Sequence, residues 1–386
     1  MLKITILLIL SAWYNCTFAD NSDLKTVNRI IDAVSRIYAP DKRTALFDVS
    51  SSEHTGQLIL KGKTNLPQAK QAVLDSLSLL QISYDDSVIV LPEASMGEKT
   101  WAIATLSVSN IRSGPGHVTE LVSQALMGTP VKVLEEEQGW FRIQTPDQYI
   151  GWIEESGIAL KTEAEMALWK RSKRFVFNQM AGYALEAPKR KASTVSDLTL
   201  GDLFETIAET KRYLQIQFPD GRTAFVKRSD CLNYGQWIAQ KPDIEIVMAM
   251  PRQLLGNPYL WGGTSCKGVD CSGMVKMAWF SQGIILARDA SQQARYGKQI
   301  DFNSIENLQK GDLLFFGRNA QRITHVGMYM GNGQYIHASG RVRINSIDSI
   351  DPLYNITERK KLVGATRILN SVNSEGIVAV KDHGWY

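Results

Sequence analysis

The stretch that decides the fold of this 386-residue chain is Val269-Asp-Cys-Ser-Gly-Met-Val-Lys-Met-Ala-Trp-Phe280. After Cys271 the apolar residues recur at spacings of three and four, which predicts a helix that begins at or beside the cysteine. Asp270 is placed to cap that helix. Backbone N–H groups and the helix dipole favour thiolate over thiol at such a position, so the pattern predicts a nucleophile.

A thiol nucleophile needs a base, and the chain has 5 histidines in all. Two of them, His325 and His337, flank Gly331-Asn332-Gly333, a sequence that predicts a β-hairpin. In a hairpin centred on Asn332, residue 325 opposes 339 and residue 327 opposes 337. Both rings then share one face on adjacent strands, one diagonal step apart. A two-residue loop would instead reverse the faces.

Five blocks of this region come in the order typical of one family: Pro258-Tyr-Leu-Trp-Gly-Gly, Asp270-Cys-Ser-Gly, Lys310-Gly-Asp-Leu-Leu-Phe-Phe, His325-Val-Gly-Met-Tyr and His337-Ala-Ser. They resemble the NlpC/P60 cysteine peptidases. The resemblance implies a papain-like α+β domain over residues 241–370 that needs no cofactor. It implies Cys271 as nucleophile, His325 as general base and later acid, and His337 as the residue that orients His325. Tyr259 would line the site and help the Cys271 amide hold the oxyanion.

Upstream, two segments repeat each other at an offset of 73 residues. Gly128, Trp140, Ile143, Pro146, Asp147, Trp152 and Ser156 correspond to Gly201, Tyr213, Ile216, Pro219, Asp220, Phe225 and Ser229. Short apolar strands separated by Pro-Asp turns predict two small β-barrels, over residues 100–160 and 181–236. Thr162 to Asn178 has helical spacing and is expected to bridge them. Asn110-Ile-Arg-Ser-Gly-Pro115 resembles the bacterial SH3-like (SH3b) fold, which alone proves no ligand.

Two SH3b domains before an NlpC/P60 domain resemble the γ-D-glutamyl-L-diamino acid endopeptidases, the dipeptidyl-peptidase VI group. The resemblance implies that the first barrel closes one end of the cleft and helps bind the ammonium group of a peptide with a free N-terminal L-Ala. The implied ammonium ligands are Glu120, Tyr149, Asp270, Ser272 and Ser291. A desolvated ammonium needs such a carboxylate and such hydroxyls. The family commonly reads Asp-Gly-Tyr where this chain has Asp147-Gln-Tyr.

Several of these residues are also compatible with a purely structural role. Glu120 and Tyr149 also fit ordinary surface or barrel-packing positions, as the less favoured alternative, and Ser291 also fits a helix cap. A metal site made of Cys266, Cys271 and the two histidines matches no common zinc spacing, so we expect none. Cys266 is either a bystander or the disulfide partner of Cys231, and the sequence leaves both open.

The first residues predict export. Lys3, the apolar run Ile4 to Trp13 and Thr17-Phe-Ala19 are typical of a secretory signal peptide over residues 1–19, so we expect a periplasmic or secreted protein. Cys16 lacks the preceding small residues of a lipoprotein site. Residues 22–92 predict a small α+β domain of unassigned role. Its expected elements are helices Leu24 to Ile37 and Leu66 to Leu80 and strands Ala45 to Val49, Gln57 to Lys61 and Ser87 to Leu91.

Composition excludes other classes. Apolar residues at 44% and charged residues at 21% are ordinary globular values, which argues against disorder. A net charge of +4 without any basic block gives no support for nucleic acid or an anionic membrane as a partner. No later stretch is apolar enough to insert stably into a membrane. We expect a monomer.

The resemblance therefore implies a cysteine endopeptidase of peptidoglycan-derived peptides, cutting between γ-D-Glu and an L-diamino acid in cell-wall turnover or recycling. It does not indicate whether that residue is diaminopimelate or lysine. One alternative is an amidase or crosslink endopeptidase acting on intact wall through the same three residues. Another is a wall-binding protein without turnover, against which the intact catalytic set argues.

Overall fold

The computed structural model describes residues 23–54 and 57–386, and the chain divides into two compact units between Gly97 and Glu98. Each unit is described by itself. The signal peptide expected at residues 1–19, including Cys16, lies outside the described residues. No helix in the described part of the chain has both the length and the apolar character needed to cross a bilayer.

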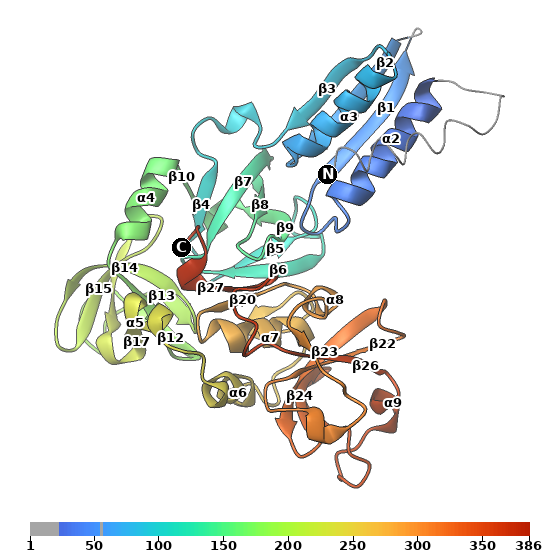
Figure 1. Cartoon of the computed structure of the whole chain (residues 1–386). Helices are drawn as coiled ribbons and strands as arrows, with labels where there is room; N and C mark the ends of the chain where they lie inside the picture. The colour runs from blue at the N-terminus through green and yellow to red at the C-terminus, as the bar shows by residue number, and fades with distance from the viewer. Residues whose placement is uncertain (1–22, 55–56) are drawn as a thin grey trace. The chain divides into compact units, whose positions relative to one another are not determined.

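The N-terminal unit contains the five elements that the sequence predicts for it. They are α2 (Asp23–Tyr38), β1 (Phe47–His54), β2 (Gln57–Thr64), α3 (Pro67–Leu79) and β3 (Asp85–Val90). β2 is central, antiparallel to β1 and parallel to β3 (Figure 1). Val27, Ile30 and Val34 recur at helical spacing, and they pack with Leu60 of the sheet and Leu77 of α3.

The second unit opens with a seven-stranded antiparallel sheet in the order β10-β4-β7-β8-β9-β5-β6. Its strands are β4 (Trp101–Ala104), β5 (Val108–Arg112), β6 (Leu121–Leu126), β7 (Pro130–Glu137), β8 (Trp140–Gln144), β9 (Ile150–Glu154) and β10 (Ile158–Lys161). Helix α4 (Glu163–Arg171) follows, and Thr162 caps it through a reciprocal pair of hydrogen bonds with Glu165.

A second seven-stranded sheet repeats the first. Its strands are β11 (Arg174–Phe177), β12 (Ala181–Leu185), β13 (Thr194–Thr199), β14 (Leu203–Glu209), β15 (Tyr213–Gln217), β16 (Thr223–Lys227) and β17 (Cys231–Asn233). Read from β17, its order is β17-β11-β14-β15-β16-β12-β13, the order of the first sheet strand for strand. All seven strands begin 73 residues after their counterparts, as Trp101 and Arg174 or Ile158 and Cys231 illustrate. The repeat expected from the sequence is therefore present in the strand topology.

The segment between the sheets differs from the expectation. We expected helical structure from Thr162 to Asn178 and a second barrel that starts at residue 181, but α4 ends at Arg171 and β11 already belongs to the second sheet. Phe175 and Phe177 enter one hydrophobic cluster while Val176 enters another. Because both faces of β11 are apolar, the strand lacks the alternation that would have identified it.

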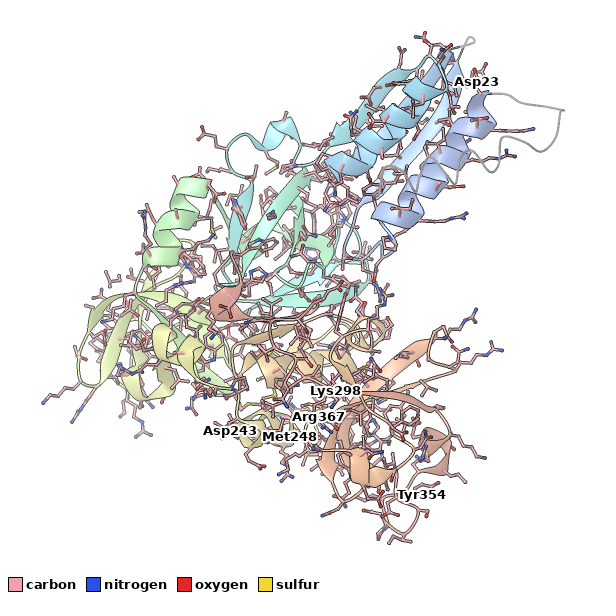
Figure 2. The ribbon with its side chains drawn as sticks, in the orientation of Figure 1. Asp23, Asp243, Met248, Lys298, Tyr354 and Arg367 are labelled. Carbon is pink, nitrogen blue, oxygen red and sulfur yellow. The ribbon has the colours of Figure 1, made fainter. Side chains whose placement is uncertain are left out.

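The C-terminal part is a six-stranded antiparallel sheet with helices packed on it. The sheet order is β21-β26-β22-β23-β24-β25. Its strands are β21 (Lys298–Gln299), β22 (Leu313–Gly317), β23 (Ile323–Gly331), β24 (Gln334–Ser339), β25 (Arg341–Ser346) and β26 (Leu362–Arg367). Lys298 and Arg367 oppose each other across its first pair of strands (Figure 2). The helices of this part are α6 (Ile244–Gln253), α7 (Cys271–Phe280), α8 (Ala290–Gln293) and α9 (Ile356–Arg359), whereas α5 (Tyr234–Ala239) packs on strands β11 and β17 of the second seven-stranded sheet.

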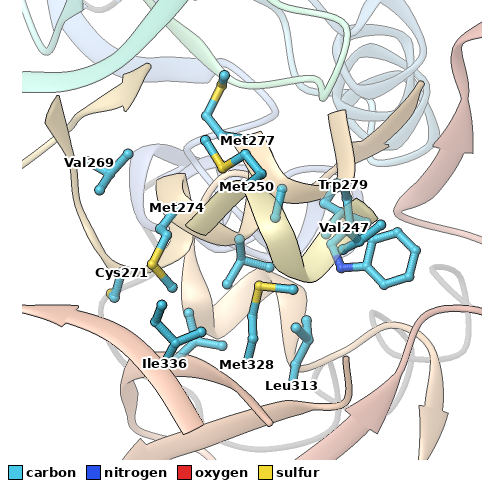
Figure 3. Close-up of a cluster of buried hydrophobic side chains, with 14 of the residues drawn as sticks. Val247, Met250, Val269, Cys271, Met274, Met277, Trp279, Leu313, Met328 and Ile336 are labelled. Atoms are coloured by element: carbon cyan, nitrogen blue, oxygen red, sulfur yellow. The ribbon is translucent and has the colours of Figure 1, made fainter. Parts of the chain in front are cut away.

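Helix α7 lies in the core between α6 and the sheet. Figure 3 shows Cys271 and Met274 of α7 near Met328 and Ile336 of strands β23 and β24, all in one buried cluster. A short ladder, β18 (Thr264–Ser265) with β19 (Gly268–Val269), precedes the helix. The nucleophile expected from the sequence is thus anchored by packing on several sides.

The chain beyond residue 370, where we placed the end of the catalytic domain, also belongs to this unit. Strand β27 (Ile377–Ala379) pairs with β20 (Ile284–Leu286). Trp385 then packs edge-on against Trp101 of β4, with ring centroids 5.3 Å apart. The last residues therefore join the catalytic part to the first sheet.

Candidate active site

The start of helix α7 matches the sequence prediction. Cys271 is its first residue and Asp270 its N-cap, whose carboxylate accepts the Gly273 N–H at 2.7 Å. Gly273 is required because a Cβ there would lie 1.9 Å from the Gly263 carbonyl oxygen. The backbone of the preceding turn thus lies close against the first turn of α7, which fixes the position of Cys271.

The hairpin that carries the two histidines also has the predicted register. Met328 pairs with Ile336 and Tyr329 with Tyr335, so the continuing register opposes Gly327 to His337. Gly331, Asn332 and Gly333 all adopt positive φ at its turn. Nε2 of His325 lies 2.7 Å from Nδ1 of His337, which is completely buried. The prediction that both rings share a face within mutual reach is confirmed.

A third member of this chain of contacts, Asn345, escaped the sequence analysis. Its Oδ1 lies 2.9 Å from Nε2 of His337. Strand β25 continues the meander beyond β24, and the Tyr335–Asn345 pair lies two positions along the ladder from the His337–Arg343 pair. Asn345 belongs to none of the sequence motifs. Only the pairing of this third strand brings it to the histidine.

The electrostatic environment differs from the expectation for the thiol. Burial raises the pKa of the Cys271 thiol to about 11, and the Asp270 carboxylate acts in the same direction. Backbone N–H groups of Val326 and Ser272 stabilise the thiolate but do not offset this. The expected thiolate in the ligand-free site is therefore wrong, because burial outweighs the amides of the first helical turn.

His325, the expected general base, is neutral as well. Burial lowers the pKa of His325 to about 3, and the neighbouring His337, Arg343 and Lys361 add to that effect. No hydrogen bond joins the Cys271 sulfur to His325 among the described residues, although Val326, which follows His325, donates to it. Catalytic hydrogen bonds commonly tighten only when substrate binds. In the resting site both the Cys271 thiol and the His325 imidazole are therefore neutral.

This resting state predicts how the Cys271 thiol ionises as the pH rises. We expect the ultraviolet absorbance of the Cys271 thiolate to be missing between about pH 5 and 8 and to appear only toward pH 11. The measurement is the difference in absorbance between the wild type and Cys271→Ala across pH. That difference is needed because burial raises the pKa of Cys266 to about 11 and that of Cys231 to about 12. A thiolate plateau already present at neutral pH and lost in Cys271→Ala would contradict the neutral pair.

A buried arginine, which the sequence analysis did not single out, organises the N-terminus of α7. Arg288 is 1% exposed, and its guanidinium donates to both oxygens of Asp270, the closer at 2.6 Å. It also donates to Ser272 Oγ at 3.1 Å and, across the domain boundary, to Ser123 Oγ at 3.2 Å. Burial opposes its charge, yet Asp270 raises the pKa of Arg288 above its ordinary value.

Two expected substrate ligands, Asp270 and Ser272, are thus already bound to Arg288. One Asp270 oxygen also accepts the Gly262 N–H, and the other accepts the Ser272 hydroxyl. These contacts position the first turn of α7, where Cys271 lies. A further contact to a substrate ammonium stays a prediction for both residues, and also for Ser291, which lies half-buried in α8.

The first sheet meets the catalytic part at the other two expected ligands. Glu120 is exposed, and its carboxylate accepts the indole N–H of Trp261 at 2.7 Å. Tyr149 is 7% exposed and close enough to Arg288 to affect its pKa. Gln148 adopts φ 67°, the left-handed conformation that a glycine adopts readily. The substituted Asp147-Gln-Tyr turn therefore keeps a glycine-like geometry.

A second buried ion pair fastens the same turn. Asp147 pairs with Lys276 of α7, and Lys276 also donates to the Leu286 carbonyl at 2.9 Å. Burial opposes the ionised form of Asp147, but Lys276 holds the pKa of that carboxyl below its ordinary value. The turn that carries Tyr149 is therefore anchored directly to the helix that carries Cys271.

The remaining thiols and polar clusters have simpler roles. Cys231 and Cys266 are both free thiols, so they form no disulfide with each other in this structure. Cys266 contacts the Met180 sulfur at 3.7 Å. Within residues 23–54 and 57–386, no group of three or more His, Cys, Asp and Glu side chains could hold a metal ion.

Comparison with known families places this site in context. The profile of the NlpC/P60 family matches residues 256–367, and that of the bacterial SH3 domain matches residues 107–159. Dipeptidyl-peptidase 6 of Lysinibacillus sphaericus is 30% identical over 271 residues, which cover 66% of this chain and 94% of that protein. A γ-D-glutamyl-L-lysine dipeptidyl-peptidase of Bacillus cereus is 30% identical over 267 residues, covering 66% and 77%.

Solved structures share the fold. An NlpC/P60 family protein from Bacillus cereus aligns with a TM-score of 0.60 at 23% identity, covering 69% of this chain and 99% of that chain. An NlpC/P60 endopeptidase from Photobacterium damselae aligns with a TM-score of 0.54 at 16% identity, covering 88% and 90%. Both alignments extend beyond the segment matched by the NlpC/P60 profile.

Proposed function

The chain belongs to the NlpC/P60 family of cysteine peptidases, and we propose that it hydrolyses the bond between γ-D-Glu and an L-diamino acid in peptidoglycan-derived peptides with a free N-terminal L-Ala. The observation that carries the proposal is the His325–His337 contact of 2.7 Å, on the strand whose Val326 amide touches the sulfur of Cys271. The name of the Bacillus cereus relative, a γ-D-glutamyl-L-lysine dipeptidyl-peptidase, supports the bond that is cut.

The proposed reaction begins with proton transfer. His325 takes the proton of the Cys271 thiol as the sulfur attacks the γ-carbonyl carbon of D-Glu. Since both groups are neutral at rest, the proton moves during the attack. The Cys271 amide and Tyr259 stabilise the oxyanion, a contribution worth about 10²–10³ in rate. Burial also raises the pKa of the Tyr259 hydroxyl, which keeps it a hydrogen-bond donor.

The second half releases two products. The C–N bond breaks as His325 returns the proton to the departing amine of the diamino acid, leaving a thioester on Cys271. Water, deprotonated by His325, then attacks the thioester carbon and releases L-Ala-γ-D-Glu. The thiol is restored, so the cycle consumes one water and needs no cofactor.

Substrate selection is assigned to the boundary between the first sheet and the catalytic part. Glu120 and Tyr149, with Asp270, Ser272 and Ser291, would hold the N-terminal ammonium. Two contacts, Asp147 with Lys276 and Ser123 with Arg288, hold the first sheet against the catalytic part. They support a rigid wall of the binding site there rather than a mobile domain. A fixed wall favours free peptides over peptides still joined to glycan.

The recognition claim predicts a difference between two peptides. N-acetylation of L-Ala-γ-D-Glu-diamino acid removes the charge that Glu120 would pair, so we expect kcat/KM to fall roughly 10²-fold or more. Glu120→Gln should lower kcat/KM for the free peptide and leave the acetylated one unchanged. Products are identified by mass. Equal cleavage of both peptides would remove the ammonium claim, and release of lactyl-linked peptides would favour an amidase.

Three further assignments belong to the proposal. The second seven-stranded sheet is a second SH3b domain, supported by its matching strand order. The catalytic domain is papain-like, supported by the order of the nucleophile helix and the histidine strands. The enzyme acts outside the cytoplasm, which the signal-like residues 1–19 support, and it acts as a monomer.

A further inference from the structure

The two histidines continue into an ordered chain of hydrogen bonds that ends on the backbone. Nε2 of His325 contacts Nδ1 of His337 at 2.7 Å, and Nε2 of His337 contacts Oδ1 of Asn345 at 2.9 Å. Nδ2 of Asn345 donates to the Leu353 carbonyl at 3.1 Å. Three side chains from three successive strands are thereby joined to one peptide group.

The last contact fixes the direction of all the others. A carbonyl oxygen only accepts, so the NH₂ group of Asn345 must face Leu353 and its oxygen must face His337. Nε2 of His337 must then carry a hydrogen, which leaves Nδ1 of that neutral ring as an acceptor. His325 must in turn donate from Nε2. The one lone pair left on the His325 ring is on Nδ1.

We propose that Asn345 is a positioning residue that sets the tautomer of both histidines, so that Nδ1 of His325 is the basic nitrogen in the resting enzyme. This inference rests on the proposed function, in which that nitrogen takes the thiol proton. It adds a residue that touches neither substrate nor nucleophile. The opposite tautomer would place a hydrogen on Nδ1 and leave the thiol without a base.

The anchor of Asn345 is itself held by other contacts. The Leu353 carbonyl also accepts the Ser346 N–H at 3.0 Å, and Leu353 N–H donates to Asp351 at 2.7 Å. Asp351 also accepts from Gln334 of β24 at 2.9 Å. Tyr354, labelled in Figure 2, marks this loop, and it bridges to Ser346. Leu353 thus keeps its place without help from Asn345.

Both rings are kept neutral, mainly by burial, so the position of the single ring hydrogen matters. Burial is the largest effect on both rings, and it lowers the pKa of His337 as well as that of His325. Arg343 of β25 disfavours protonation of both rings, and Lys361 that of His325. Glu358 of α9 acts in the opposite direction on His337. From α7, the sulfur of Cys271 is neutral too.

Two substitutions separate the tautomer role from a structural one. Asn345→Ala removes the acceptor, and we expect kcat to fall about 10- to 100-fold with KM nearly unchanged. Asn345→Asp keeps an acceptor for His337 but loses the donor to Leu353. It should retain most of kcat, and the acidic limb of its kcat–pH profile should move to higher pH because a carboxylate stabilises imidazolium.

The direct readout is ¹⁵N NMR of the ring nitrogens in the full-length chain, recorded in the Cys271→Ala background. We expect hydrogens on Nε2 of both His325 and His337, and a mixture of tautomers once Asn345→Ala is added. Asn355→Ala is the matched control. It removes an asparagine of the same loop, which caps α9 through Thr357 and Glu358, and should leave both tautomers unchanged.

The outcomes divide clearly. A hydrogen on Nδ1 of His325 without substitution at Asn345 would overturn the proposal, as would equal losses of activity in Asn345→Ala and Asn345→Asp with unchanged tautomers. Thermal unfolding of each variant identifies any general loss of stability. The NMR result does not depend on the substrate, so failure of the peptide assay alone would count against the proposed function only.

Discussion

Replacing Cys271 with alanine is expected to lower kcat/KM for L-Ala-γ-D-Glu-diamino acid by roughly 10⁴-fold or more, the loss typical when a covalent nucleophile is removed. Helix α7 has no other nucleophile at its first turn, because the Ser272 hydroxyl donates to Asp270 and accepts from Arg288. The measurement is product formation under identical conditions for the wild type and the variant.

Cys266→Ala provides the matched control. It removes a thiol of similar pKa that lies away from the histidines, against Met180. We expect it to keep activity within about twofold, since substitutions away from the chemistry usually have small effects. Substantial turnover by Cys271→Ala, together with impaired turnover by Cys266→Ala, would contradict the assignment of Cys271 as the nucleophile.

Replacing Arg288 with methionine is expected to lower the free energy of unfolding by about 3–5 kcal/mol, the range for removing one partner of a buried ion pair. The substitution leaves Asp270 buried without its cation and breaks the contact to Ser123 of the first sheet. Denaturant unfolding monitored by tryptophan fluorescence measures the change. Activity should fall as well, because Asp270 caps the helix of Cys271.

A double-mutant cycle tests the cause of that loss. Asp270→Asn combined with Arg288→Met removes both charges, and we expect it to be clearly more stable than the sum of the single changes predicts. Arg318→Met, at an exposed position, is the control and should cost less than about 0.5 kcal/mol. Simple additivity of the two buried substitutions would show that the pair carries no coupling.

Much of the site follows from local sequence signals. The start of α7 depends on Asp270 and on apolar spacing within one helix. The register of the histidine hairpin depends on three turn residues, Gly331 to Gly333. The tandem sheets repeat at a fixed offset, which a single sequence displays directly. Each of these features is encoded by residues close together in the chain.

The parts that could not be predicted depend on the assembled fold. Arg288 meets Ser123 only when the first sheet docks, and Asn345 meets His337 only through the pairing of β25 with β24. The high pKa of Cys271 arises from burial by segments distant in sequence. The helix signal that suggested a thiolate was real, but it was the smaller of the two opposing effects.

The most direct test of the central claim is peptide mapping by mass spectrometry after treatment with L-Ala-γ-D-Glu chloromethyl ketone, in which an electrophilic carbon occupies the place of the scissile bond. Attack of Cys271 at that bond predicts one adduct per chain, on Cys271, whose formation the free tripeptide slows and Asn345→Ala retards. Labelling of Cys231 or Cys266 instead, or an enzyme that stays unlabelled and fully active, would contradict it.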